Sequence, residues 1–384
     1  MIDLNKYALH GATKLLILQP TSFCNIACSY CYLPHRNHRT IMSHETVDLA
    51  AKFIFDAQLH SDHFTVVWHA GEPLVVPPSW YRQAIDAIQQ AAPATMDIPH
   101  AIQTNGILIS DEWCDLFLET GMRVGVSIDG PARLHDERRK TRAGTGTHAL
   151  VMRGIDFLRK RGVNFHVICV LGRNSLGAAE EILHFFRSEG ICDVGFNIEE
   201  IEGHIVRSTL AGPETTEYVR NFFSTAIRLA ENGTPLIRIR ERERLIALLR
   251  DPAFGSYRHN SQNAPFGIVT VTTDGDLFTF SPELAGLSHA RYPDFSIGTV
   301  RDATLDSVLA SPTFQAIWQE VQAGVNRCKT NCPYFDLCLG GAPVNKLYEN
   351  GRFDSTETMF CRLSHQAVAD VVLTEIETQM AGPS

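Results

Sequence analysis

Ten cysteines are the residues of this 384-residue chain whose type and spacing most clearly imply chemistry. Three form a tight group near the start, and four more gather near the end. The other three are scattered through apolar stretches, where a free cysteine acts as a small buried hydrophobe: Cys114, Cys169 and Cys192. The first residues hold no apolar stretch long enough for an export signal. We therefore expect a cytoplasmic protein whose clustered thiols serve metal or redox chemistry, not disulfides.

The first group is Cys24, Cys28 and Cys31, spaced Cys-x3-Cys-x2-Cys in the segment QPTSFCNIACSYCYLP. Structural zinc sites use four ligands, commonly in Cys-x2-Cys pairs. Three thiolates in one loop, with no fourth Cys or His beside them, suit an iron–sulfur cube with one iron free of protein ligands. Such an iron can chelate a small molecule. A zinc site, or three ordinary loop thiols, is the alternative.

The second group is Cys328, Cys332, Cys338 and Cys361, with gaps of three, five and 22 residues. Four thiolates satisfy either a 4Fe–4S cube or a zinc ion. The gaps differ from the short knuckles of zinc ribbons, which favours iron–sulfur and leaves zinc as the alternative. A cube held by four thiolates has no open iron, so we expect an electron acceptor or a structural staple.

Strand-like and helix-like segments alternate six times in the first two-thirds of the chain. The expected strands cover 14–19, 64–69, 100–105, 123–129, 164–171 and 194–199, and the helices 43–58, 78–90, 111–120, 148–162, 176–188 and 214–232. This order predicts parallel strands joined by right-handed crossovers. Because no G-x-G-x-x-G follows the first strand, we predict an α/β fold of the partial (β/α)6 TIM-barrel type and not a doubly wound sheet.

The pattern changes after residue 232, which predicts three parts: a barrel over 1–232, a bridging helix and linker over 233–263, and an α+β domain over 264–384. The bridge contains a helix at 236–250. In the last part we expect a hairpin at 267–280 turning at Asp274-Gly275, a short strand at 295–300 and a helix at 304–324. Few signals follow until a last helix after Cys361.

Polar motifs stand at successive strand ends, where barrel enzymes place their active sites. The first cysteine loop follows strand one, WHAGEP (68–73) ends strand two, QTNG (103–106) ends strand three, and SIDGP (127–131) ends strand four, with Arg139 beyond. Alone, each is a common turn sequence, and Arg138-Arg139 is an ordinary charged surface run. Their order along the strands indicates one shared site.

The three-cysteine loop followed by an aromatic residue resembles the radical S-adenosylmethionine (SAM) superfamily. The resemblance implies that Cys24, Cys28 and Cys31 hold a 4Fe–4S cluster whose open iron binds the amino and carboxylate groups of SAM. One electron then cleaves SAM to methionine and a 5′-deoxyadenosyl radical. It also implies an electron donor such as flavodoxin or ferredoxin.

The same resemblance implies the SAM-binding residues. Ala70, Gly71 and Glu72 match the GGEP motif that holds the SAM amino group, with alanine at its first glycine. Ser127 would contact the ribose or carboxylate side, Arg139 would pair with the carboxylate, and Asp129 would orient the loop. The remaining expected contacts are Asn105 and the two aromatic residues beside the cluster, for which loop packing is the alternative: Tyr30 and Tyr32.

The tail resembles the C-terminal SPASM/twitch extensions of radical SAM peptide maturases, which carry auxiliary iron–sulfur clusters. Full SPASM domains have seven cysteines and two clusters, whereas four cysteines here suffice for one. LLILQPTSFCNIACSYCYLPHR and CPYFDLCLGGAPVNKLYENGRFDSTETMFCRL resemble the GrrM/OscB group in particular. That group implies a glycine-rich ribosomal precursor peptide as substrate and a three-residue cyclophane, formed between an aromatic ring carbon and a β-carbon.

The implied reaction needs two acceptors. After the radical removes a β-hydrogen and the carbon radical attacks the ring, rearomatisation releases one electron and one proton. The auxiliary cluster could take the electron. Glu199 or Glu200, at the end of strand six, is the candidate catalytic base, with a solvated acidic loop as the alternative.

Two other functions stay open. A sulfatase maturase, oxidising Cys or Ser to formylglycine, shares the barrel motifs but normally carries the seven-cysteine tail. A zinc-stapled, catalytically silent peptide-binding protein is the non-enzyme alternative. The net charge of −9 argues against nucleic acid or an anionic membrane as partner. No apolar run approaches the ~20 residues of a membrane helix.

Overall fold

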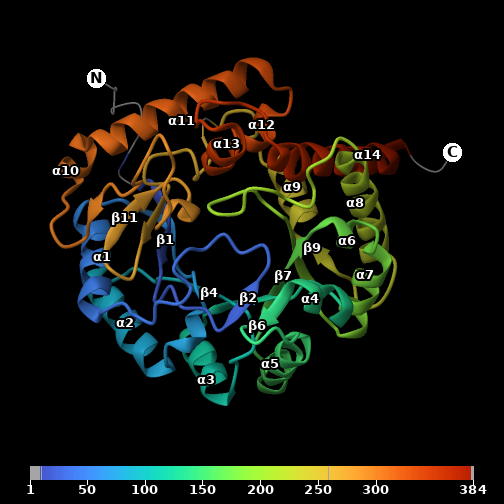
Figure 1. The fold of residues 1–384 in the computed structure, drawn as a ribbon, viewed down its shortest axis with the longest axis horizontal. Coiled ribbons are helices and arrows are strands. Elements are labelled where there is room, and N and C mark those ends of the chain that lie inside the picture. The colour runs from blue at the N-terminus through green and yellow to red at the C-terminus, as the bar shows by residue number, and fades with distance from the viewer. Residues whose placement is uncertain (1–8, 10, 258, 382–384) are drawn as a thin grey trace.

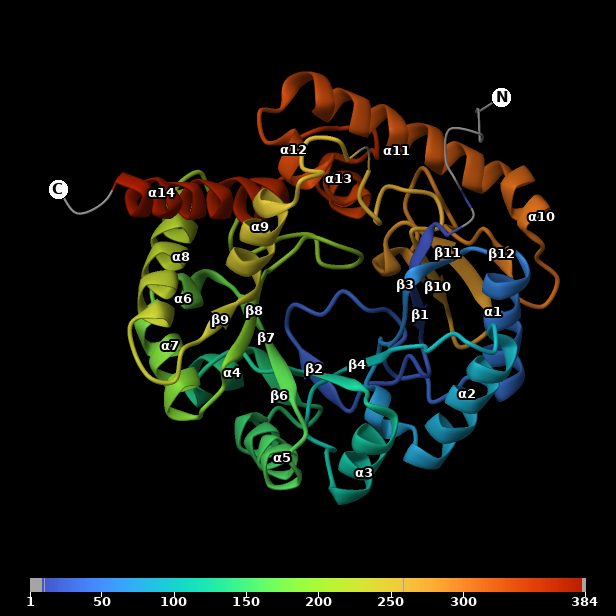
Figure 2. The same cartoon turned by 180° about the vertical axis from the view of Figure 1, so that it is seen from behind.

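The computed structural model of the protein describes residues 9, 11–257 and 259–381. Within these residues, ten strands form one sheet in the order β12-β11-β10-β1-β3-β4-β5-β7-β8-β9. Figures 1 and 2 show this sheet curving around the centre of the molecule, with the helices outside it. The sheet stays open, with β12 and β9 as its two edges.

The six predicted strand–helix units are confirmed. Their strands are β1 (Thr13–Leu18), β3 (His60–Trp68), β4 (His100–Thr104), β5 (Arg123–Ser127), β7 (Phe165–Leu171) and β8 (Asp193–Ile198), each parallel to the next. Their main helices are α1 (His44–Asp56), α2 (Pro78–Ala91), α3 (Asp111–Thr120), α5 (His148–Arg161), α7 (Ala179–Ser188) and α8 (Thr215–Glu231). Helices lie outside the sheet (Figures 1 and 2), and the strands consist mostly of buried apolar residues, as in other parallel sheets.

Local signals set the helix ends. The Ser43 side chain caps α1 by accepting from the Thr46 N–H at 3.0 Å. Gly121 and Gly162 end α3 and α5 in the left-handed conformation, which costs glycine no steric penalty.

A small second sheet was not predicted. β2 (Ile26–Cys28) pairs antiparallel with β6 (Arg139–Thr141), which follows the short helix α4 (Ala132–Arg138). Three-residue strands carry too little periodicity to be read from sequence. The pairing sets Cys28 opposite Arg139 and so fastens the cysteine loop to the segment after β5.

The predicted hairpin is confirmed as β10 (Ile268–Val271) and β11 (Asp276–Thr279), followed by β12 (Gly298–Thr299). β10 lies parallel to β1, so one sheet runs across the predicted boundary at 263/264. The three-part division remains a proposal.

The helix predicted at 236–250 was wrong at its start. It begins at Arg240, as α9 (Arg240–Arg250), because Arg238–Ile239 instead adds to β8 as the strand β9. Hydrogen bonding to a neighbouring strand here outweighs the local helical preference.

The helix predicted at 304–324 is two helices, α10 (Leu305–Ala310) and α11 (Pro312–Asn331). Ser311 is extended and caps α11, with Pro312 at the first helical position, where proline is favoured. The helix also extends beyond 324 and carries Cys328.

The tail contains more helix than expected. α12 (Phe335–Cys338), α13 (Pro343–Asn350), a π-helical turn η4 (Cys361–Gln366) and α14 (Ala367–Ala381) follow α11. Only the last was predicted. α11, α12 and α13 lie together at one side of the molecule in both views (Figures 1 and 2). α13 was missed because polar residues occupy its buried face, among them Asn345 and Lys346.

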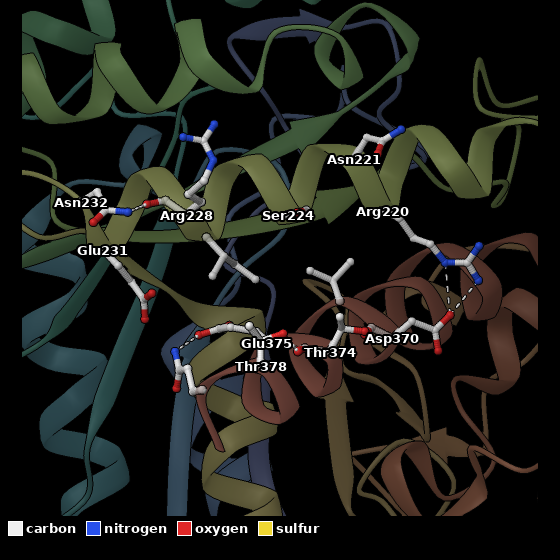
Figure 3. Close-up of a pocket in the computed structure, with 13 residues that line it drawn as sticks. Arg220, Asn221, Ser224, Arg228, Glu231, Asn232, Asp370, Thr374, Glu375 and Thr378 are labelled. Atoms are coloured by element: carbon white, nitrogen blue, oxygen red, sulfur yellow. Dashed lines mark hydrogen bonds and ion pairs between the residues drawn. The ribbon is translucent and has the colours of Figure 1, made fainter. Parts of the chain in front are cut away.

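A cavity of about 640 Å³ lies between α8 and α14 (Figure 3). Arg220 donates to Asp370 at 2.7 Å across it, and Gln379 donates to Glu375 at 3.0 Å. None of the predicted site residues lines it. Its other charged groups pair with residues outside the lining, Arg228 with Glu180 and both Glu231 and Glu375 with Arg242, and we take the cavity to be the seam along which α14 packs on the barrel.

Within the described part of the chain, no helix is both long and apolar enough to cross a bilayer.

The buried His100 predicts a measurable acid sensitivity. Its Nδ1 accepts from the Trp68 indole N–H at 3.2 Å, and burial lowers its pKa from 6.5 to about 4. The unfolded chain binds this proton first as the pH falls, so stability is lost from pH 6.5 downward. Between pH 7 and pH 5, urea unfolding should show wild type losing about 2 kcal/mol more than His100→Asn, which keeps an acceptor. An equal loss in both proteins would contradict this.

Candidate active site

The cysteine loop leaves the carboxyl end of β1 and is fastened at both ends. Arg142 donates to the Cys24 carbonyl from Nε at 2.8 Å and from Nη2 at 2.6 Å. Cys28 is paired with Arg139 through β2 and β6. Arg142 was missed in the sequence, since it follows no strand of the barrel and stands in a run of charges.

The surroundings of the Cys24 and Cys28 thiols suit a bound metal cluster, which would hold both sulfurs as thiolates. Burial raises the pKa of Cys24 to about 12 and that of Cys28 to about 11, so the bare thiols are neutral. Two donors nevertheless point at the sulfurs: Asn105 Nδ2 lies 3.9 Å from Cys24 Sγ, and Arg139 Nη1 lies 3.8 Å from Cys28 Sγ. Bound metal ions deprotonate their thiols, and N–H donors to sulfur are typical of iron–sulfur sites.

The turn after β3 is pressed against this loop. A Cβ on Gly71 would lie 2.5 Å from the carbonyl oxygen of Phe23 and 2.6 Å from that of Thr21, and its φ is +58°. Only glycine fits there. Ala70 also has a left-handed φ of +81°, a strain that the glycine of the GGEP motif avoids.

Glu72 joins the ends of β3 and β4. Its Oε1 accepts from the Leu74 N–H at 3.0 Å and from the Thr104 hydroxyl, and its Oε2 accepts from the Asn105 N–H at 2.8 Å. It is 1% exposed, and burial raises its pKa to about 7. The structure thus joins the motif that ends β3 to the motif that ends β4. Asn105 Nδ2 also donates to Asn25 Oδ1 in the cysteine loop at 2.7 Å.

Asp129 is the centre of a buried network. Its Oδ2 accepts from Arg139 Nε at 2.9 Å and from the Tyr30 hydroxyl at 2.8 Å, and its Oδ1 accepts from the Val170 N–H at 2.9 Å. The Arg139 guanidinium holds the pKa of this carboxyl below its usual range against the opposing effect of burial. The Tyr30 ring also lies under Arg138, 4.1 Å from its Cζ.

Ser127, at the end of β5, accepts from Gln103 Nε2 on β4 at 3.0 Å. Its hydroxyl proton has no acceptor among the hydrogen bonds of the described residues and is free for a ligand. This contact adds a second link between the ends of neighbouring strands.

Glu199 and Glu200 have different surroundings. Glu199 is buried and forms an ion pair with Arg138, and it accepts from the Thr209 N–H at 2.7 Å and the Thr209 hydroxyl at 3.1 Å. Glu200 instead accepts a hydrogen bond from Asn345 Nδ2 of helix α13 at 2.6 Å. The two neighbouring carboxylates therefore hold different parts of the chain.

Glu200 belongs to a group of three carboxyls, of which Glu202 is buried and Glu200 and Glu283 are half-buried, that the sequence did not reveal as a unit. Asn345 Nδ2 also donates to Glu202 at 3.2 Å, and Glu283 lies close enough to raise the pKa of Glu202. Glu202 and Glu200 hydrogen-bond to each other, and burial raises the pKa of both. Burial raises the pKa of Tyr32, and the charges of these three carboxyls and of Cys31 raise it further. The three carboxyls therefore lie near the cysteine loop.

The four tail cysteines line one cavity of about 410 Å³: Cys328, Cys332, Cys338 and Cys361. They come from α11, its C-terminal end, α12 and the π-helical turn η4. The same cavity is lined by Lys346, whose Nζ lies 3.3 Å from Cys328 Sγ. Across residues 9, 11–257 and 259–381, no three His, Cys, Asp or Glu side chains have the close spacing of a site for a single metal ion.

Replacing Gly71 by alanine should dislodge the cysteine loop, because the new Cβ would overlap two carbonyl oxygens. Gly121→Ala is the matched control: its φ is +62° but nothing lies within 4 Å of its Cβ. The control should lose about 1 kcal/mol in urea unfolding. Gly71→Ala should lose clearly more and bind less iron after reconstitution. Equal losses and equal iron would show that the close approach does not matter.

The chain is similar in sequence to several known proteins. The sequence profile of the Radical SAM superfamily matches residues 18–186. "Uncharacterized protein sll1766" of Synechocystis sp. is 41% identical over 96% of this chain and 94% of its own length. The serine-type anaerobic sulfatase-maturating enzyme of Bacteroides thetaiotaomicron is 28% identical over 88% of this chain and 85% of its own.

Solved structures show the same fold. "Native anSMEcpe with bound AdoMet" has a TM-score of 0.75 at 19% identity and covers 95% of this chain and 98% of its own. Streptococcus suis SuiB bound to the precursor peptide SuiA has a TM-score of 0.60 at 14% identity, covering 93% and 78%. The cysteine loop, the ordered strand-end motifs, the profile match and this likeness lead to one conclusion: the chain belongs to the radical SAM superfamily.

Proposed function

We propose that this protein oxidises a ribosomal, glycine-rich precursor peptide and joins an aromatic ring carbon to a nearby β-carbon, forming a cyclophane. A 4Fe–4S cluster on Cys24, Cys28 and Cys31, with SAM and an electron from a flavodoxin or ferredoxin, supplies the 5′-deoxyadenosyl radical. Peptide-acting relatives support a peptide substrate: the sulfatase-maturating enzymes in sequence, and SuiB with its precursor peptide in fold.

The crosslink requires two acceptors close to the substrate. Removal of the β-hydrogen atom leaves a carbon radical, which bonds to the ring and disrupts its aromaticity. The ring regains aromaticity by losing one proton and one electron. The peptide therefore loses two hydrogens in total, and the enzyme must accept the proton and the electron separately.

Helix α13 is the single observation that carries this proposal. Asn345 donates to Glu200 and Glu202, beside the cysteine loop. The next residue, Lys346, contacts Cys328 in the four-cysteine cavity. Adjacent residues of one helix thus touch a carboxylate pair that can take a proton and a thiol group suited to a cluster that can take an electron.

Glu200 is our candidate base. Glu202 is buried whereas Glu200 is half-buried, so Glu200 is the carboxyl of this pair that a substrate can reach. Burial raises the pKa of Glu200 toward the range in which a base works well near neutral pH. The Glu199 carboxylate already binds Arg138 and Thr209, so we propose that Glu199 has a structural role at the end of β8.

For the electron, we propose one auxiliary 4Fe–4S cluster held by the four tail cysteines. The support is their shared cavity and its volume of about 410 Å³. Four thiolates leave no iron open for substrate, which suits electron transfer. Iron and sulfide analysis of a variant lacking the first three cysteines separates this cluster from a zinc ion.

The SAM contacts remain as proposed from the motifs. Glu72 and Asn105 would act by shaping the strand ends, and Arg139 would offer its remaining N–H groups to the SAM carboxylate while Asp129 holds it. The other proposed contacts are Tyr30, Tyr32, Ala70, Gly71 and Ser127.

Formylglycine formation is the second candidate, because the curated relatives include serine-type and cysteine-type sulfatase-maturating enzymes. It also needs a proton and an electron acceptor. The β10–β11 hairpin and the whole segment from 264 to 327 contain no cysteine, which leaves one auxiliary site where the seven-cysteine tail has two.

Tandem mass spectrometry distinguishes the two reactions. A glycine-rich, aromatic-containing peptide co-expressed with the enzyme under low oxygen should lose two hydrogens per site, with backbone fragmentation suppressed across the crosslinked segment. Formylglycine would instead carry an aldehyde that reacts with a hydrazide. An unmodified glycine-rich peptide, with 5′-deoxyadenosine still formed and an aldehyde on a sulfatase peptide, would contradict the cyclophane proposal.

Glu200→Gln tests the base. Crosslinking should fall by about 10²-fold or more, because general-base catalysis contributes that much, while 5′-deoxyadenosine formation continues. Glu112→Gln, an exposed position on α3, is the matched control and should keep full activity. Unchanged crosslinking in Glu200→Gln would remove Glu200 from the mechanism.

A further inference from the structure

Lys346 is a buried lysine whose charged end faces a sulfur. It lies on α13, is 4% exposed, and its Nζ is 3.3 Å from Cys328 Sγ. Lysine is almost never this buried unless its charge is paired. The cavity it lines is the one formed by the four tail cysteines.

No carboxylate offsets the charge of Lys346 inside this cavity. Among the described residues that line it, Lys346 is the only Lys or Arg. The one acidic lining residue, Glu357, is exposed and binds Arg362 at 3.2 Å and Gln366 at 3.1 Å. Burial lowers the pKa of His365 to about 4, so it is neutral.

Asp354, whose Cα also lies close to Gly324, is bound by Arg327 and Arg352. Among the residues that line the cavity, the thiolates or the group they hold are therefore the counter-charge left for Lys346.

The packing keeps the ammonium in place. Gly324 of α11 faces it, and a Cβ there would lie 3.2 Å from Lys346 Nζ and 2.4 Å from the carbonyl oxygen of Phe353. The absence of a side chain at Gly324 thus leaves room for both groups. A lysine enclosed in this way cannot extend its charge into water, as surface lysines do.

We propose that Lys346 is a positioning residue that raises the reduction potential of the auxiliary cluster. The proposal rests on the proposed function, because it requires the four tail cysteines to hold an iron–sulfur cluster. Adding one electron makes a four-thiolate cluster more anionic. A fixed positive charge against one of its sulfurs stabilises the reduced form more than the oxidised form, and the low dielectric of a buried site strengthens this effect.

The consequence is a better electron acceptor. The electron released on rearomatisation passes from the substrate to the oxidised cluster, which becomes reduced, while the proton goes to the base. A higher potential favours that transfer. Charge and hydrogen bonding around cluster sulfurs are established means of setting potentials in proteins.

The test uses the full chain with Cys24, Cys28 and Cys31 all changed to alanine, so that only the tail cysteines can hold a cluster. In this parent we compare Lys346→Gln, Lys346→Arg and Lys329→Gln. Lys329 is the matched control, because it follows Cys328 directly in sequence but is exposed. Each protein is reconstituted with iron and sulfide, and its midpoint potential is measured by titration monitored by electron paramagnetic resonance.

Lys346→Gln should shift the midpoint potential to a more negative value, with at least a tenfold change in the reduction equilibrium constant, about 59 mV for one electron. Lys346→Arg and Lys329→Gln should stay near the parent. An unchanged potential in an iron-loaded Lys346→Gln would overturn the proposal. A parent that binds zinc or no metal would instead refute the auxiliary cluster of the proposed function, a separate result.

If Lys346→Gln cannot be loaded with iron, Lys346→Arg decides. Loading and a parental potential in the arginine variant would show that the positive charge is what the cluster requires. Failure of the arginine variant as well would mean that Lys346 is needed for shape, and would overturn the assignment of its charge to the potential.

Discussion

The buried ion pair between Asp129 and Arg139 holds the site together. Both side chains are enclosed, at 1% and 7% exposure, and the pair joins the end of β5 to β6, which in turn pairs with the cysteine loop through Cys28. Asp129 also receives the Val170 N–H of β7, so three segments from different parts of the chain meet at one carboxylate. Breaking such a pair by removing one partner costs about 3–5 kcal/mol, because the other charge is left buried. The Asp129–Arg139 pair therefore ties the cysteine loop to the ends of β5 and β7.

Helix α13 connects the C-terminal tail to the barrel end that carries Glu200 and Glu202. The chain after α11 could have packed as a separate unit, yet Asn345 reaches back to Glu200 and Glu202 beyond β8. The Oδ1 of this 1%-exposed asparagine and Oε2 of Glu283 have no hydrogen-bond partner in the described part of the chain. Buried polar atoms without partners cost free energy and are few in native structures, so these two atoms mark the group as unusual.

Periodicity and motif order predicted the barrel strands well. Strands such as Phe165–Leu171 are long and apolar except for His166, and their pattern is independent of distant partners. The motifs Glu72 and Asn105 were linked by strand order alone, and the structure joins them by a hydrogen bond of 2.8 Å. Several short elements were not predicted. β2, β6 and β9 depend on a partner strand for their hydrogen bonds, and α13 buries polar residues whose partners lie far away in sequence.

The cysteine spacing and the alternation of strands and helices, both local properties, were enough to reveal the superfamily, the parallel sheet and the strand ends where its chemistry belongs. The three-dimensional arrangement alone decided which of two adjacent glutamates is available. Glu199 forms an ion pair with Arg138, 61 residues away in sequence, whereas half-buried Glu200 lies with Glu202 and Asn345. The three-dimensional arrangement alone also places Lys346 Nζ next to Cys328 Sγ. Burial and long-range pairing determine the charge and pKa of such groups, and neither can be read from neighbouring residues in the chain.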